Sequence, residues 1–193
     1  MSTHGRTPLF LELTNRVVVV VGGGAVAASK LDALLRAGAR VQVIAPEIQP
    51  RIASLDVTLV RRSFVPEDLD GAWLAVAAGP PDVNREVARA AEQRRVWVNA
   101  VDDPNAASAF AGGVLRRAGV TIAISTSGQA PALAGLLREA LEAVIPEELE
   151  TWIDEARTQR RRWKAEGVPF EKRRPLLLQA LNRLYDDPVE EAS

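Results

Sequence analysis

Short apolar runs alternate with segments of helical spacing over the first 145 residues of the chain. Residues 17–21 are five consecutive valines, as expected of a strand buried on both faces. Leu31, Leu34 and Leu35 follow at helical spacing within residues 25–37, and Gly38 predicts the end of that helix. The other predicted strands are residues 40–44, 58–61, 73–78, 96–100 and 120–124, and the other predicted helices are residues 82–95 and 132–144. This alternation predicts an α/β fold with a doubly wound parallel sheet of the Rossmann type.

Three further segments have a different character. Residues 8–13 alternate weakly and are predicted to pack beside the first strand, and residues 64–71 are predicted to form a loop. From residue 146 the chain becomes mostly helical with dense charge, and its second helix, residues 169–185, carries leucines in helical register. The sequence therefore predicts a helical tail after the sheet.

A glycine turn lies between the first strand and the first helix. Gly22, Gly23 and Gly24 permit a turn too tight for a Cβ, and Ala27 allows the helix to pack closely on the strand. The free N–H groups at the start of the helix suit a pyrophosphate. In its strand-turn-helix setting the pattern favours dinucleotide binding over a purely structural turn.

The expected ribose contact is less well defined. The position about 20 residues past the glycines holds Ile44 or Ala45, and Glu47 is the nearest carboxylate. Arg40 and Arg51 flank this region, so NADP is disfavoured only mildly. Gly79 follows the fourth predicted strand, where the loop is expected to border the cofactor.

Two polar segments are candidates for chemistry, and each has a plain structural alternative. Asp102 and Asp103 follow the fifth predicted strand, where α/β proteins place their chemistry, but Asp-Asp-Pro is also a good turn sequence. The segment from Ser125 to Gly128 precedes a helix and could bind a carboxylate or cap that helix. The residues alone favour the cap.

Composition narrows the chemistry further. The 193 residues carry a formal net charge of −1, which gives no overall attraction to nucleic acid or anionic membranes. The absence of cysteine excludes disulfides, thiol nucleophiles and cysteine metal sites, and we expect no protein-bound metal. His4 is the only histidine, so a general acid or base must be a carboxylate, a lysine or a tyrosine. No signal peptide or membrane span is recognisable, and we expect a cytoplasmic protein.

Several motifs occur in a fixed order along the chain. They are Pro8-Leu9-Phe10, the glycine turn with Lys30, Val98 to Pro104 with Ser108, and Ile124 to Ala134 followed by Leu136-Leu137-Arg138-Glu139. Each is unspecific alone, but the ordered set resembles the precorrin-2 dehydrogenase family, the NAD-dependent module of siroheme synthases. The resemblance covers residues 8–145 and implies a homodimeric enzyme that oxidises precorrin-2 to sirohydrochlorin with NAD. Some members also insert ferrous iron, and the sequence leaves that activity open.

The resemblance also implies roles for individual residues. Asp102 corresponds to the catalytic aspartate, and Thr126 lies where some relatives carry a serine in the tetrapyrrole pocket. The implied substrate contacts are Ser125, Thr126, Ser127 and Gly128. The implied cofactor contacts are Gly22, Gly23, Gly24, Ala25, Val26, Pro46, Glu47 and Gly79, with Pro46 and Glu47 at the adenosine ribose. The implied organisation is a nucleotide-binding domain at 1–112, a dimerisation and substrate segment at 113–145, and a helical domain at 146–193.

The chain departs from the family pattern at three places. Gly79 replaces a frequent threonine, Ala111-Gly112-Gly113 replaces a region that usually contains proline, and Ser127-Gly128 replaces a usual Gly-Gly. No methyltransferase domain follows, which resembles the stand-alone form of the enzyme. Two rival functions stay open: a non-catalytic dinucleotide sensor that regulates a partner, and a tetrapyrrole carrier that needs no NAD.

Overall fold

The computed structural model describes residues 6–101, 103–127 and 129–186, which form two compact units. The first unit runs to Ala111 and includes Ser127 and Gln129, and the second comprises Gly112–Thr126 and the chain from Ala130. The predicted division at 112 and 145 into three parts stays a prediction.

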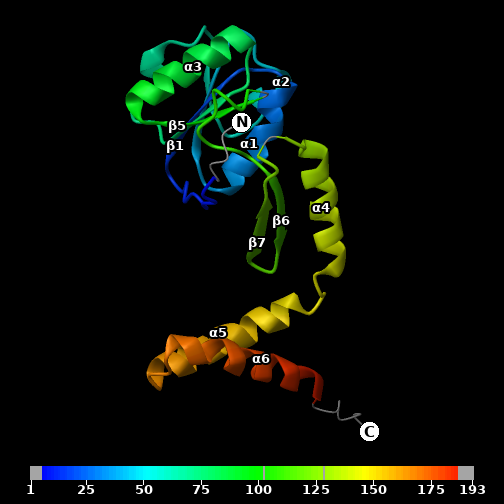
Figure 1. Ribbon diagram of the computed structural model, residues 1–193. Coiled ribbons are helices and arrows are strands. Elements are labelled where there is room, and N and C mark those ends of the chain that lie inside the picture. Colours follow the sequence, from blue (N-terminus) through cyan, green and yellow to red (C-terminus); the bar gives the residue numbers. More distant parts are fainter. Residues whose placement is uncertain (1–5, 102, 128, 187–193) are drawn as a thin grey trace. The chain divides into compact units, whose positions relative to one another are not determined.

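The first unit is built on one five-stranded parallel sheet (Figure 1). The strands are β1 (Val17–Val21), β2 (Arg40–Ile44), β3 (Thr58–Val60), β4 (Leu74–Ala77) and β5 (Trp97–Ala100). Their order across the sheet is β3-β2-β1-β4-β5, so the strand order reverses beside β1. This confirms the predicted Rossmann-type sheet.

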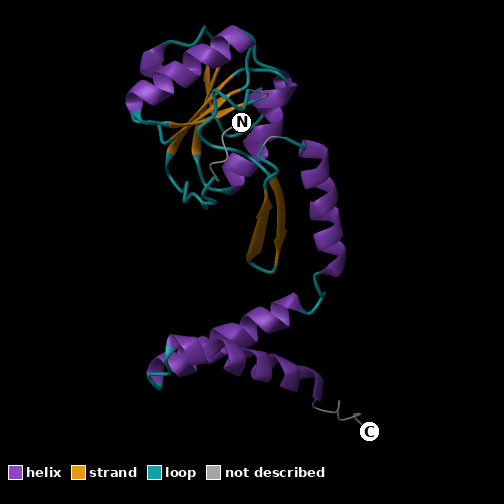
Figure 2. Ribbon diagram, in the orientation of Figure 1, coloured by secondary structure: helices purple, strands orange, loops and turns teal. Residues whose placement is uncertain are grey.

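The central strand β1 supplies both hydrophobic cores. Val18 and Val20 belong to the core that packs under helix α1 (Ala25–Arg36), whereas Val19 and Val21 belong to the core under helix α3 (Pro81–Arg94). These four valines are at most 3% exposed. Successive side chains of a strand point to opposite faces, so an unbroken valine run is what a sheet covered on both faces requires. Figure 2 shows helices on both sides of the sheet.

Some of the short elements differ from the prediction. The connection after β2 contains a one-turn helix, α2 (Pro50–Ala53), and the predicted loop at 64–71 contains a 3₁₀ helix, η1 (Pro66–Leu69). Both begin with proline, whose fixed φ suits the first helical position. In the segment 8–13 only Leu13 is buried, so the expected packing beside β1 reduces to one side chain.

The second unit begins with a hairpin that the sequence analysis missed. Strand β6 (Gly113–Arg117) pairs antiparallel with β7 (Val120–Ile124), and Ala118 and Gly119 turn the chain with positive φ. Only the β7 half was predicted. Helix α4 (Pro131–Val144) packs against both strands, and the Arg117 Nη1 donates a hydrogen bond of 2.8 Å to the Ile145 carbonyl just after it.

The predicted helical tail is present as two helices. Helices α5 (Leu149–Ala165) and α6 (Phe170–Asp186) pack on each other, and the Trp152 Nε1 donates to the Tyr185 hydroxyl at 2.7 Å. Trp163 is the buried anchor of α5, at 7% exposure. No helix within the described parts of the chain is both long and apolar enough to cross a bilayer.

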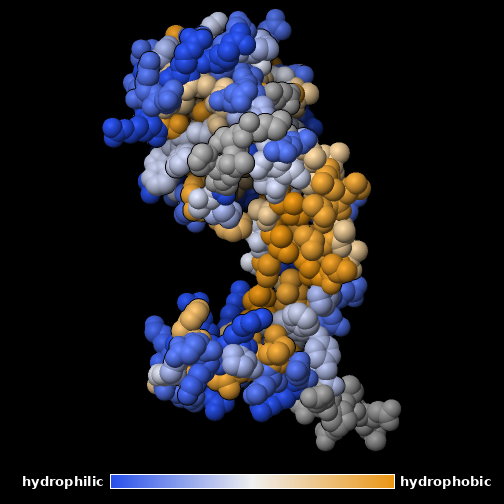
Figure 3. Space-filling view, in the orientation of Figure 1, coloured by the Kyte–Doolittle hydropathy of each residue, from blue (hydrophilic) through white to orange (hydrophobic). Residues whose placement is uncertain are grey.

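Helix α4 carries a large exposed apolar surface, which we call the α4 face. Figure 3 shows apolar side chains gathered over this helix. The large apolar residues that α4 exposes are Leu133, Leu136, Leu137 and Val144. Contiguous apolar surface of this kind is typical of an interaction site.

An ion pair between a half-exposed arginine and a buried aspartate holds the chain segment that follows β3. The carboxylate of Asp68 accepts a hydrogen bond from the Arg62 Nη1 at 2.8 Å and one from the Val65 N–H at 2.9 Å. Its side chain is only 5% exposed. Burial raises the pKa of Asp68, but the hydrogen bonds from Arg62 and the Val65 N–H outweigh it, so the pKa lies below its ordinary value.

Replacing Asp68→Asn should therefore destabilise the fold by about 1 kcal/mol near neutral pH. Because the folded-state pKa is lowered, the carboxylate stabilises the fold above the unfolded pKa of about 4, and this contribution is lost as the pH falls through the folded pKa. Urea unfolding of both proteins should show the difference shrinking in acid. Asp70→Asn is the matched control, because Asp70 pairs with Arg94 with 67% of its side chain exposed. A pH-independent difference would contradict the assignment.

Candidate functional site

A cavity of about 520 Å³ opens at the carboxyl ends of the central strands, and we call it the strand-end cavity. Its lining includes the last residues of β1 and β2, the loop after β4, and the loop after β3. Six of the predicted cofactor residues line it: Gly22, Gly23, Gly24, Pro46, Glu47 and Gly79. Ser63, Phe64, Val83 and Glu86 also line it and were not singled out from the sequence. The cavity lies where open α/β sheets bind ligands.

The first two glycines are required by the packing of backbones around them. Gly22 has a φ of +130°, and a Cβ there would collide with the carbonyl of Ala78 beyond β4. A Cβ on Gly23 would collide with the carbonyl of Glu47 beyond β2. These glycines therefore let the ends of three neighbouring strands converge.

Gly24 is different, because a Cβ built on it would meet nothing within 4 Å. It is the N-cap of α1, which has no side-chain cap and no acidic residue in its first turn, where Ala25 and Val26 lie. The open space beside Gly24 thus adjoins helix N–H groups and a partial positive charge. Backbone of this kind fits the pyrophosphate of a dinucleotide.

The loop after β4 is held by a residue that the sequence analysis missed. The side-chain Oδ1 of Asn84 accepts a hydrogen bond of 2.9 Å from the Gly79 N–H, and Asn84 is 6% exposed. Asn84 shares the buried face of α3 with Val87 and Ala91. The sequence feature that could have identified Asn84 is its position as a polar residue on the otherwise apolar face of this helix. The Asn84 amide therefore fixes the loop through the backbone of Gly79.

Two carboxylates, those of Glu47 and Glu86, line the cavity. The end of β2 carries no acidic side chain, because Ile44 ends the strand and Ala45 follows it, and both residues are buried. Glu47 lines the cavity three residues beyond β2, and Glu86 of α3 lines it as well. No lysine or arginine is among the described lining residues.

The turn after β5 is organised by Asp103. Its Oδ1 accepts hydrogen bonds from the N–H groups of Asn105 at 3.1 Å and Ala106 at 3.3 Å, as expected of a turn-forming aspartate. The predicted catalytic residue, Asp102, lies outside the described residues. The carboxylate of Asp103 therefore has a structural task, and the catalytic assignment rests on its neighbour.

The hydroxyl residues after β7 do not cap α4 directly. The N-cap of α4 is Ala130, without a side-chain cap, and Pro131 follows it at the first helical position. The Thr126 Oγ1 instead accepts the Ala130 N–H at 3.2 Å. This differs from the predicted cap because the helix begins several residues beyond the hydroxyls. Ser125 and Ser127 lie beside Thr126 in the chain, and Gly128 lies outside the described residues.

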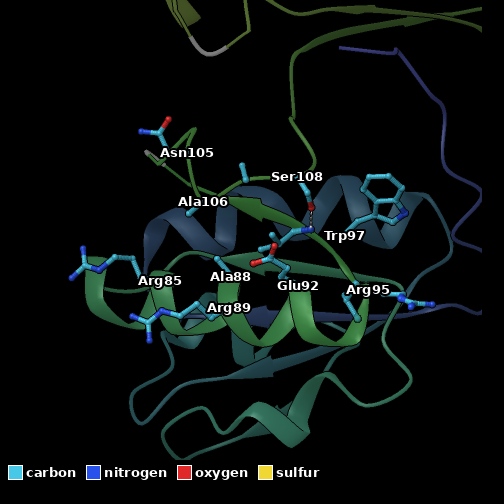
Figure 4. Close-up of a pocket in the computed structure, with 12 residues that line it drawn as sticks. Arg85, Ala88, Arg89, Glu92, Arg95, Trp97, Asn105, Ala106 and Ser108 are labelled. Carbon is cyan, nitrogen blue, oxygen red and sulfur yellow. Dashed lines mark hydrogen bonds between the residues drawn. The ribbon is translucent and has the colours of Figure 1, made fainter. Parts of the chain in front are cut away.

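A larger cavity, of about 620 Å³, lies between α3 and the segment after β5. Figure 4 shows the side chains of Arg85 and Arg95 at its opposite ends, with Glu92 between them. Arg89 lies at the same end as Arg85 (Figure 4). In the described parts of the chain, no cluster of three or more histidine, aspartate or glutamate side chains could hold a metal ion.

Comparison with known proteins identifies the family to which the first unit belongs. Residues 9–113, more than half of the chain, match the family described as "Putative NAD(P)-binding". The chain belongs to this NAD(P)-binding family. Residues 117–143 match a second family, described as "Sirohaem biosynthesis protein central".

The relatives agree with both matches. The chain is 41% identical to siroheme synthase 3 of Aeromonas hydrophila over 172 residues, which cover 86% of this chain and 37% of that protein. It is 41% identical to the siroheme synthase of Photorhabdus laumondii over 180 residues, 91% of this chain and 38% of that protein. The chain thus spans under two fifths of the length of these relatives. The resemblance to the NAD-dependent module of siroheme synthases is confirmed.

A solved structure supports the fold. The structure titled "SirC, precorrin-2 dehydrogenase" matches with a TM-score of 0.69 and 24% sequence identity, over 90% of this chain and 88% of that one. At this identity the match shows a shared fold.

The glycine turn generates a prediction that separates folding from binding. Gly23→Ala should destabilise the fold by about 2 kcal/mol, because the new Cβ meets a backbone carbonyl. Gly24→Ala should cost less than about 1 kcal/mol, because its Cβ faces open space. It should nevertheless weaken NADH binding about ten-fold or more by blocking the approach of the pyrophosphate. Urea unfolding and NADH fluorescence titration measure the two effects, and equal NADH affinity in Gly24→Ala and the wild type would contradict this role.

Proposed function

We propose that the chain catalyses the NAD-dependent oxidation of precorrin-2 to sirohydrochlorin in the cytoplasm. The proposal rests on the glycine turn, where the space beside Gly24 is open within a segment that matches an NAD(P)-binding family. Residues 117–143, which follow that segment, match a family of siroheme biosynthesis. The names of the relatives and of the structural neighbour support the same reaction.

The lining of the strand-end cavity supports NAD over NADP. NADP carries an additional phosphate on its adenosine ribose, and proteins commonly accommodate it with an arginine. Glu47 and Glu86 would repel that phosphate, and the described lining offers no cation to neutralise it. Glu47 is instead suited to accept hydrogen bonds from ribose hydroxyl groups.

The oxidation removes two hydrogens from the substrate, one as a hydride and one as a proton. NAD, when bound, supplies the hydride acceptor. Asp102 is the residue that we assign to accept the proton, since the resemblance places the catalytic aspartate there and the only histidine is His4. The glycine turn and the Asn84-held loop orient the cofactor side of the reaction.

Cationic side chains are needed for the carboxylates of the tetrapyrrole. The Arg117 guanidinium already donates a hydrogen bond to the Ile145 carbonyl after α4. Arg116, its neighbour on β6, is exposed and forms no recorded ion pair within the described residues. Arg116 is therefore the better candidate of the two for a substrate contact.

The test is an anaerobic assay with precorrin-2 and NAD that follows NADH and the pigment spectrum together. NADH should appear in step with sirohydrochlorin, and NADP should support slower turnover. Asp102→Asn should bind NADH normally but turn over about 100-fold more slowly or worse, since it lacks the proton acceptor. Asp103→Asn is the matched control and should retain turnover, because an amide oxygen can still accept the N–H groups of the turn.

Unchanged turnover in Asp102→Asn would remove that residue from the mechanism. NAD binding without hydride transfer in the wild type would overturn the dehydrogenase and favour the dinucleotide sensor. Ferrous iron added to the product mixture tests the second activity, with iron as a substrate.

We further propose that the chain forms a homodimer through the α4 face. Leu136 is 64% exposed and Val144 is 71% exposed, values that are costly for large apolar side chains left in water. A second copy would cover such a surface, and homodimer interfaces are the more apolar class of interface.

Leu136→Asp should therefore shift the protein from dimer to monomer, because a carboxylate would be buried in the apolar interface. Multi-angle light scattering after size exclusion measures the mass. Leu178→Asp is the matched control, since Leu178 is similarly exposed, at 61%, but lies on α6. Equal masses for the wild type and Leu136→Asp would contradict a dimer through this face.

A further inference from the structure

Ser127, which follows β7 and belongs to the first unit, is connected through Arg6 to the loop after β5 by a chain of contacts within that unit. The first link joins the loop after β5 to the edge of the sheet. The N–H groups of Ser108 and Ala109 both donate to the Val98 carbonyl at 2.9 Å, and the Ser108 Oγ accepts the Val98 N–H at 2.9 Å. The Asn99 Nδ2 donates to the Ala109 carbonyl at 3.0 Å. These four bonds fix the position of the next residue, Phe110.

The second link is a cation–π contact. The Arg6 guanidinium carbon lies 3.6 Å from the centre of the Phe110 ring, within the range in which an aromatic face attracts a cation. The planar guanidinium stacks on the ring and so takes one orientation. The N–H groups of the guanidinium point outward in its plane, and stacking on the ring leaves them able to donate hydrogen bonds.

The third link reaches the hydroxyl loop. The Arg6 Nη1 donates a hydrogen bond of 2.8 Å to the Ser127 carbonyl, 121 positions away in the sequence. Ser127 has a φ of +58°, in the left-handed region that residues with a Cβ seldom adopt. A charge-assisted bond to its carbonyl helps to hold this unfavourable backbone conformation.

We propose that Arg6 is a positioning residue for the tetrapyrrole substrate, one that holds the loop after β7 in its binding conformation through the Ser127 carbonyl. The inference rests on the proposed function, because the loop contains the residues assigned to the substrate. Arg6 itself need not contact the substrate. Its effect reaches the substrate through the backbone between Thr126 and Ser127.

The test compares Arg6→Ala with Arg16→Ala in the full chain. Arg16 is a matched control, because its guanidinium lies 3.8 Å from the centre of the Trp73 ring but it has no recorded bond to the hydroxyl loop. Arg6→Ala should raise KM for precorrin-2 about five-fold, as expected from the loss of one solvent-exposed hydrogen bond, and leave KM for NAD unchanged. Arg16→Ala should change neither. Arg6→Lys should recover part of the loss, since it keeps a cation and a donor.

A second readout needs no turnover. Amide hydrogen exchange in peptides covering residues 124–131 should be about five-fold faster in Arg6→Ala than in the wild type or in Arg16→Ala. The effect of Arg6→Ala should also be smaller in a Ser127→Gly background, because glycine adopts positive φ without the steric cost.

The outcomes separate the two proposals. A wild-type chain without turnover would overturn the proposed function. Unchanged loop exchange in Arg6→Ala would overturn the positioning role, and so would faster exchange with an unchanged KM for precorrin-2.

Discussion

The close approach of backbones at Gly22 and Gly23 is the constraint on which the candidate site depends. The carbonyls of Ala78 and Glu47 occupy the places where Cβ atoms would otherwise stand, so the ends of β1, β2 and β4 converge. This convergence leaves the face of Gly24 open and sets the start of α1 beside it. Packing thus requires glycine at two of the three positions, whereas the third leaves the space that the proposed dinucleotide would occupy. The three positions hold the same residue type, but the reason for glycine differs between them.

The sheet could be predicted from local pattern because its central strands, β1 and β4, are apolar throughout and buried on both faces. The bounds of β1 and β2 agree with the predicted segments, and so do those of β7 in the hairpin of the second unit. Strand β6 was missed because Gly113 opens it and Arg116 and Arg117 close it, which leaves only two apolar residues. The short helices α2 and η1 were missed because one turn contains too few residues to establish a period.

The candidate site was predictable where it depends on backbone and unpredictable where it depends on distant side chains. Topology predicted that the glycine turn and the loop at Gly79 border one site, the family resemblance added Pro46 and Glu47, and all of them line one cavity. The Asn84 bond to Gly79 required knowing which face of α3 is buried. The contact between Arg6 and Ser127 spans 121 positions and leaves no trace in local pattern. Residues this far apart are brought together by the topology of the fold, and no pattern of residue spacing in the sequence predicts such a contact.

Two loops of this chain are held by side chains from other segments, and both contacts are made to backbone groups. The side-chain Oδ1 of Asn84 accepts a hydrogen bond from the Gly79 N–H in the loop after β4. The Arg6 Nη1 donates to the carbonyl of Ser127, whose positive φ is unfavourable for a residue with a Cβ. A side chain that binds a backbone group fixes the path of a loop whatever the side chain at the loop position itself. The backbone of these two loops is therefore positioned by residues outside them, which is the kind of support that a binding site needs to keep its geometry.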